Sequence, residues 1–354
     1  MGYLPLENPK WAGKVMVTQM NNDLKIYRAA VAVTSVITLI GAAMLAIFEL
    51  AFYDTGTNLF SRGAPSWIIM LFAAVGILFS VISSLLIRAE NFPLTYPEKS
   101  SKFTGFAELL CAGVLILTFA VQFIRLGNTT DHLTELWLTS GNTLSAAVRM
   151  LRISVFLALA SSIYFIFSFI TQKSSTALAI VFCLWVFAYL LRIYYDMSLL
   201  IVDPVRKLTI AALCSILLFM CAEIRMIVGK PSPRLFVCFG FLALFFCGAS
   251  GISKLIITFT GFDGFTTQSV YDCFEVAFAL YVLSRLLAFV SEEAYDNSVK
   301  FAVSETSEPK EPTSSAGSDT APDTAAVTEI NTNNDAGTVD DAPENNDDKS
   351  EESK

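Results

Sequence analysis

The stretch LFVCFGFLALFFCGASGISKLIITF, residues Leu235–Phe259, contains one charged residue among its 25 positions. A bilayer core about 30 Å thick requires roughly 20 apolar residues at the helical rise per residue, so this stretch is long enough to cross it. Because lipid offers no hydrogen-bond partners to a backbone, such a stretch must also be helical. We therefore interpret Leu235–Phe259 as a membrane-spanning helix.

Seven more apolar runs of similar length surround this stretch, and together the eight fill residues 28–291. The whole chain is 54% hydrophobic and contains 29 phenylalanines, more than a soluble chain of 354 residues normally carries. The sequence thus predicts an all-α fold, a polytopic membrane helix bundle of about eight transmembrane helices. The predicted spans are Ala29–Phe52, Trp67–Ile87, Thr104–Ile124, Met150–Ile170, Thr176–Tyr195, Leu208–Val228, Leu235–Phe259 and Val270–Val290.

The segments outside the bundle are polar. Residues 1–27 are predicted to be a cytoplasmic N-terminal segment, in which a short helix from Lys10 to about Met20 lies at the membrane interface. Residues 292–354 are predicted to be an acidic, disordered cytoplasmic tail, because they lack the large apolar side chains that a packed core needs. Residues 303–354 alone hold 14 Asp and Glu against 3 Lys, so the chain's net charge of −8 reflects the tail and not the bundle.

Short linkers and basic residues predict the threading. The linkers Thr171–Ser175 and Gly229–Arg234 are so short that the spans they join must be antiparallel neighbours. Basic residues favour the cytoplasmic side, which places both termini in the cytoplasm and the protein in the plasma membrane. The predicted cytoplasmic side has ten basic residues: Lys10, Lys14, Lys25, Arg28, Arg88, Lys99, Lys102, Lys173, Lys230 and Arg234. The opposite side has five: Arg62, Arg125, Arg149, Arg206 and Lys207.

Aromatic residues mark the predicted ends of the spans. Tyr and Trp are enriched where a membrane protein meets the headgroups. We expect this position for Tyr27, Tyr53, Trp67, Tyr194, Tyr195 and Tyr271.

Ionisable residues inside the spans are the candidate functional residues, because a charge in hydrocarbon costs roughly 2.5–3.5 kcal/mol on insertion scales. They are Glu108, Glu223, Arg225, Glu275, Arg192 and Lys254, and none lies at the middle of its span. Arg192 and Lys254 have long stems, so we expect them to extend to the interface. The shorter carboxylates need a partner or a proton.

Two pairings are expected at opposite ends of the bundle. Lys254 or Arg192 is a candidate partner for Glu275 or Glu49 at one end, and Arg225 or Arg285 for Glu108 or Glu223 at the other. Because Glu223 and Arg225 are two residues apart and face different directions, we expect span six to be an interior helix. Structural ion pairs and a proton or solute pathway both remain open as interpretations.

The sequence lacks the signatures of an enzyme. There is no phosphate-binding glycine-rich loop, and the single histidine, His132, lies outside the spans, so the spans lack the histidine that Ser-His or zinc-dependent hydrolysis inside a membrane needs. The seven cysteines lie in or at the ends of apolar runs, where they act as small hydrophobes. We expect no cofactor, no metal and no nucleic-acid partner, but a lipid bilayer and membrane protein partners.

Two functions remain. The first is a non-enzymatic protein that senses, scaffolds or assembles with partners in the membrane. The alternative is a secondary transporter or channel for a small solute or ion that uses Glu108, Glu223 or Glu275. All twelve prolines lie outside the predicted spans, so the broken helices typical of transporter sites are not predicted.

One segment of the chain carries a resemblance. Glu223-Ile224-Arg225, followed by Gly229-Lys230-Pro231-Ser232-Pro233-Arg234 and a Phe- and Leu-rich span, resembles multi-pass membrane proteins of anaerobic Gram-positive bacteria to which no activity is assigned. The resemblance covers about 40 residues. It implies a bacterial source and brings no site residues with it.

Overall fold

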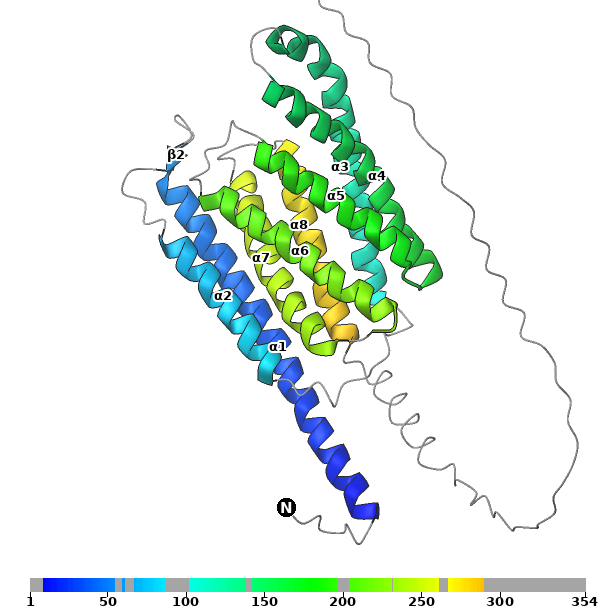
Figure 1. Ribbon diagram of the computed structural model, residues 1–354. Helices are drawn as coiled ribbons and strands as arrows, with labels where there is room; N and C mark the ends of the chain where they lie inside the picture. Colours follow the sequence, from blue (N-terminus) through cyan, green and yellow to red (C-terminus); the bar gives the residue numbers. More distant parts are fainter. Residues whose placement is uncertain are drawn as a thin grey trace, which may run out of the picture. The chain divides into compact units, whose positions relative to one another are not determined.

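Eight helices make up the described part of the chain in the computed structural model (Figure 1). The structure describes residues 9–54, 59–60, 67–86, 102–137, 142–195, 204–230, 232–260 and 267–289, and side chains within 24–52, 67–86, 102–124, 150–194, 206–230, 232–260 and 269–289. The elements are α1 (Pro9–Phe52), β1 (Tyr53–Asp54), β2 (Leu59–Phe60), α2 (Trp67–Leu86), α3 (Lys102–Trp137), α4 (Asn142–Thr171), α5 (Thr176–Tyr195), α6 (Pro204–Ile227), α7 (Pro233–Phe259) and α8 (Thr267–Ala288).

The predicted all-α fold class is confirmed. All eight helices coincide with predicted spans, and seven of them, α1 to α7, are long and apolar enough to cross a membrane. The eighth, α8, carries Asp272, Glu275 and Arg285 within its 22 residues. The strands β1 and β2 form only a two-residue antiparallel pair. The predicted tail, residues 292–354, and the first eight residues lie outside the described part.

Helix ends follow local sequence signals. α1, α6 and α7 begin at Pro9, Pro204 and Pro233, where the missing amide proton is no loss in a first helical turn. α6 ends in a Schellman motif, in which Gly229 N donates to Met226 O and Lys230 N to Arg225 O. Gly229 has a φ of 77°, which a residue without a side chain adopts at no cost.

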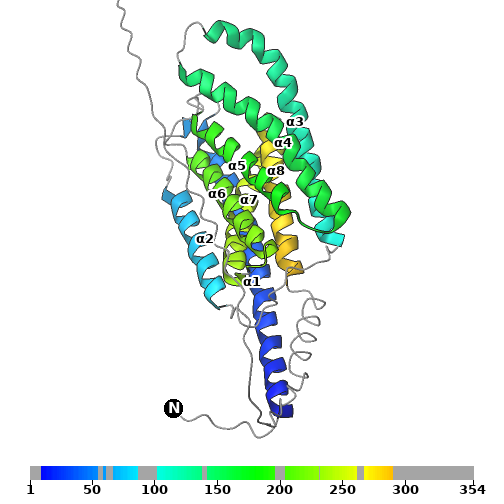
Figure 2. The ribbon, with the colours of Figure 1, turned by 45° about the vertical axis from the view of Figure 1, so that its right-hand side comes forward.

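Three predicted helix boundaries were wrong because the helices continue. α1 is one helix from Pro9 to Phe52, so the short interfacial helix predicted from Lys10 to Met20 is not a separate element. α3 runs on to Trp137 and α4 begins at Asn142, so both absorb residues predicted to connect spans three and four (Figure 2). In all three places polar residues with adequate helix propensity extend an apolar helix past the end of its hydropathy signal.

The centre of the bundle is formed by α7 and α8. α7 packs against α1, α2, α6 and α8, and α8 packs against α3 as well (Figure 1). Aromatic side chains of α4, α5 and α6 also contact α8. Between Ser269 and Phe289 only Leu287 is exposed. The antiparallel neighbours predicted from the short linkers, α4 with α5 and α6 with α7, are in contact.

Span six was expected to be an interior helix, and only one face of α6 is interior. α7, and not α6, is the most buried of the seven apolar helices. α6 turns Cys214, Leu218 and Cys221 outward, and Arg225 is exposed on the same helix. Glu223 and Arg225 do face different directions as their spacing requires, but only Glu223 faces the interior.

Small residues allow the close approach of α7 to its neighbours. A side-chain carbon at Gly248 would lie 2.4 Å from Thr38 Cγ2 of α1, and one at Gly76 of α2 would lie 2.0 Å from the ring of Phe245 in α7. Real carbon atoms do not come this close, so glycine is required for the observed spacing. Gly251 of the same helix likewise faces α8, where a side-chain carbon would lie 2.8 Å from Val276 Cγ2.

Candidate functional site

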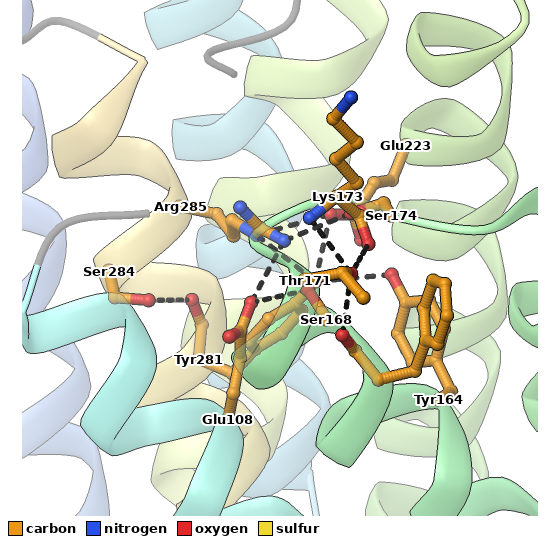
Figure 3. A network of polar contacts seen from close by, with 11 residues as sticks. Glu108, Tyr164, Ser168, Thr171, Lys173, Ser174, Glu223, Tyr281, Ser284 and Arg285 are labelled. Carbon is orange, nitrogen blue, oxygen red and sulfur yellow. Dashed lines mark hydrogen bonds and ion pairs between the residues drawn. The ribbon is translucent and has the colours of Figure 1, made fainter. Parts of the chain in front are cut away.

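The first buried polar cluster, which we call the Arg285 network, comprises Glu108, Glu223 and Arg285 with the side chains that bond to them (Figure 3). Arg285 Nη2 lies 3.1 Å from Glu108 Oε1, and Arg285 Nε lies 3.3 Å from Glu223 Oε1. Both glutamates are fully buried and Arg285 is 4% exposed. One guanidinium of α8 therefore joins carboxylates of α3 and α6.

Neutral donors complete the Arg285 network. Ser168 Oγ of α4 donates to Glu108 Oε1 at 2.8 Å, and Tyr281 OH of α8 donates to Glu223 Oε1 at the same distance. Arg285 donates from Nε to Tyr281 OH at 3.1 Å and from Nη2 to Ser174 Oγ at 3.3 Å. The network thereby links α3, α4, α6, α8 and the turn before α5.

The turn between α4 and α5 brings Ser174 into this network. Gln172 has a φ of 53°, a left-handed conformation that reverses the chain directly after α4. Thr171 Oγ1 donates to Lys173 O at 3.1 Å within the same turn. Figure 3 draws Thr171, Lys173 and Ser174 together with the side chains of this network.

The second buried polar cluster, which we call the Lys254 network, lies toward the other ends of α7 and α8. Lys254 Nζ lies 3.3 Å from Asp272 Oδ1 and 3.6 Å from Glu275 Oε2, and it donates to Thr209 Oγ1 of α6 at 2.8 Å. Glu49 of α1 also interacts electrostatically with the Lys254 ammonium. This ammonium therefore connects α6, α7 and α8.

A layer of buried aromatic rings fills the space between the two networks. On α8, Phe274 and Phe278 lie between Asp272 and Tyr281 in the sequence, and Phe278 packs against Phe182 of α5 and Phe219 of α6. Trp185 meets Phe274 edge to face. Glu275 and Arg285 are ten residues apart, which is about 15 Å along a helix. The two networks are thus separate polar clusters and not one continuous chain.

The predicted pairings are present in part. Arg285 pairs with Glu108 and Glu223, and Lys254 pairs with Glu275. Arg225 is not part of the Arg285 network, because it lies on the exposed side of α6.

The expectation that Lys254 extends to the interface was wrong, because its side chain is only 11% exposed and its charge is paired. Arg192 is half-buried and donates to Tyr271 OH at 2.8 Å, with its guanidinium over the rings of Tyr189 and Tyr271. Its charge is therefore stabilised inside the bundle by an aromatic pair.

Two of the tyrosines expected at the span ends turn their side chains into the bundle. Tyr27 is fully buried and donates to Leu286 O at 3.0 Å, and Tyr271 is 2% exposed. Trp67 and Tyr194 are exposed. The side chains of Tyr53 and Tyr195 lie outside the described part.

Sequence reasoning missed Asp272, Tyr281 and Arg206 as contributors to the polar interior. Asp272 is one turn before Glu275, and Tyr281 is one turn before Arg285. This helical spacing indicates that each residue shares a helix face with the charged residue that follows it. Arg206 of α6 is buried and donates to the carbonyls of Ile193 and Tyr194, the last turn of α5. Because Arg206 lies near a predicted span end, nothing in the sequence indicated that it caps the end of α5.

The side chains that the structure describes include no group of three His, Cys, Asp or Glu residues arranged to hold a metal ion. Both networks are instead made of cation–carboxylate pairs with hydroxyl groups that donate or accept hydrogen bonds. Such groups can tie helices together or exchange protons.

Comparisons with known proteins give no family. No protein-family model matches the chain, no curated protein matches it, and no solved structure matches it. The class of the protein follows from its own structure. A helical bundle with seven helices of membrane-spanning length and composition is an integral membrane protein, and its exposed apolar side chains contact the lipid bilayer.

Proposed function

We propose that this protein is a non-enzymatic multi-pass protein of the plasma membrane, with both termini in the cytoplasm, that senses or scaffolds by assembling with partner membrane proteins. The observation that supports it is the use of the buried charges. Arg285 connects α3, α6 and α8, and Lys254 connects α6, α7 and α8. Buried charges that join several helices fix how these helices are arranged. A fixed arrangement gives the protein a constant surface on which partner proteins can assemble.

The aromatic layer also supports a static bundle. A pathway for a hydrophilic solute needs polar groups or water along its length. Between the two networks, Phe182, Phe219, Phe274 and Phe278 present buried hydrocarbon. An enzyme finds little support, because the only histidine of the chain lies outside the spans.

A secondary transporter or channel for a small solute or ion is the second candidate. The observation that favours it is the composition of the Arg285 network, in which two carboxylates share one guanidinium. Glu108 Oε2 is buried and has no hydrogen-bond partner among the described residues. Carboxylates in such a setting are suited to binding a proton or a cation during transport.

Flux and crosslinking separate the two functions. Purified protein reconstituted in vesicles is assayed for proton and solute uptake, in parallel with Glu108→Gln, Glu223→Gln and Glu275→Gln. Crosslinking in native membranes identifies neighbours. The scaffold proposal expects no protein-dependent flux and one recurring crosslinked partner. Flux that the folded Gln variants abolish contradicts the scaffold and supports the transporter.

A further inference from the structure

Glu275 of α8 has the least satisfied carboxyl group of the described interior. Its residue is 1% exposed. Neither Oε1 nor Oε2 accepts a hydrogen bond from any described residue. Its single ion-pair contact is Lys254 Nζ, 3.6 Å from Oε2. A buried carboxylate normally needs both a close cation and hydrogen-bond donors to remain ionised.

The cation beside Glu275 is shared with other groups. Lys254 Nζ is closer to Asp272 Oδ1, at 3.3 Å, and it donates a hydrogen bond to Thr209 Oγ1. Glu49 of α1 also acts on this ammonium, and the Cys247 thiol of α7 is the other titratable group that senses Glu275. One ammonium therefore serves several carboxylates, and Glu275 shares it with Asp272, whose oxygen lies closer to the lysine nitrogen.

A hydroxyl group is placed to bond to this carboxyl. Ser250 of α7 lies beside Glu275, is fully buried, and its Oγ has no hydrogen-bond partner of ordinary geometry among the described residues. Gly251 brings the two helices together, since a side-chain carbon there would lie 3.0 Å from Glu275 Cβ. The Ser250 hydroxyl can accept a hydrogen bond from a protonated Glu275 and can donate one to its carboxylate, so it can partner the carboxyl group with and without a proton.

We propose that Glu275 is a reversible proton-binding site within the bundle. In the occupied state the proton taken from water resides on a Glu275 carboxyl oxygen, and Lys254 is balanced by Asp272. When the proton returns to water, the Glu275 carboxylate competes for Lys254 with Asp272 and Thr209. Proton occupancy thus changes how α6, α7 and α8 are tied together. The site is independent of whether the protein scaffolds or transports.

The ligand is a proton and not a metal cation for two reasons. The Lys254 ammonium already lies within 3.6 Å of the carboxyl and repels a second cation. In addition, no set of three His, Cys, Asp or Glu side chains in the described part is arranged for a metal ion.

Infrared spectroscopy of the full-length protein in lipid tests the site. A protonated carboxyl has a C=O stretching band that a carboxylate lacks. Difference spectra are recorded between about pH 5 and pH 9, the range around neutrality where perturbed carboxyls titrate. We expect such a band at low pH, its reversible loss as the pH rises, and its absence from Glu275→Gln.

Glu223→Gln is the matched control. Glu223 is equally buried, but it accepts a hydrogen bond from Tyr281 and lies 3.3 Å from Arg285 Nε, so its substitution should leave the band in place. If Glu275→Gln does not fold, labelling of the wild-type protein by an apolar carbodiimide, which reacts with protonated carboxyls, takes its place. We then expect Glu275 to be labelled in preference to Glu223.

Three results would overturn the assignment. The first is a band unaffected by Glu275→Gln, and the second is a band that does not vary with pH. The third is the absence of a protonated carboxyl together with a spectrum that responds to Na⁺ at constant pH, which would assign the site to a metal cation.

Discussion

Replacing Arg285 by methionine removes the cation of the Arg285 network while approximately keeping its volume. At an effective dielectric constant of about 20, each contact of Arg285 with Glu108 and Glu223, at 3.1 and 3.3 Å, corresponds to roughly 5 kcal/mol of attraction. Most of that attraction offsets the desolvation of the charges. Removal of one partner from a buried ion pair typically costs about 3–5 kcal/mol, because an uncompensated charge remains.

We expect Arg285→Met to lie near the lower limit, at about 3 kcal/mol, because the two glutamates can take up protons once the guanidinium is lost. This is roughly a 100-fold change in the folding equilibrium. The measurement is equilibrium unfolding in mixed micelles with increasing sodium dodecyl sulfate, followed by circular dichroism. Arg225→Met is the matched control, since Arg225 is exposed on α6, and we expect a change within about 0.5 kcal/mol.

A triple variant isolates the charge effect from packing. Replacing Glu108 and Glu223 by glutamine together with Arg285→Met leaves no buried charge in the network. We expect this triple variant to recover most of the lost stability, because a neutral cluster of similar volume needs no ionic partner. A loss below about 1 kcal/mol in Arg285→Met, or a triple variant no more stable than the single one, would refute the role of the guanidinium as a tie between helices.

Three further predictions concern packing and threading. Gly76→Ala should destabilise the bundle by about 1–3 kcal/mol in detergent melts, because the new side-chain carbon meets the Phe245 ring. Gly113→Ala is the control and should not destabilise it, because nothing lies within 4 Å of a side-chain carbon there. Equal effects of the two substitutions would contradict this reasoning. Tyr27→Phe should lower the stability of the bundle by about 1 kcal/mol in the same assay, since it removes the hydrogen bond to Leu286 O. An unchanged stability would show that this hydrogen bond does not stabilise the bundle. In a variant without native thiols, a cysteine at position 128 should react with an impermeant reagent in intact cells and one at position 175 should not; the reverse pattern would invert the predicted orientation.

The positions of the helices were largely readable from the sequence. The predicted span Thr176–Tyr195 coincides with α5, and Trp67 and Phe259 are true helix ends. Apolar runs of this length force the backbone to satisfy its own hydrogen bonds, so each run specifies a helix without information from its neighbours. The extension of α4 back to Asn142 was missed because polar helical residues carry no hydropathy signal.

The partners of the buried charges were only partly readable. The sequence placed Glu108, Glu223 and Arg285 near one end of the bundle, and depth along a helix follows from counting residues. It did not show that Arg225 faces outward or that Lys254 is enclosed. When a helix is apolar on nearly all sides, hydropathy does not fix its rotation about its own axis.

The amino-acid sequence by itself therefore determined that this chain is a bundle of membrane-spanning helices, because helix formation in lipid is a local requirement. Only the tertiary structure decided that the charge-bearing α8 lies at the centre, that Arg285 joins α3 and α6, and that Glu275 is left with a shared lysine and no hydrogen bond. These properties depend on which faces of separate helices meet, and that is settled by packing between residues distant in the chain.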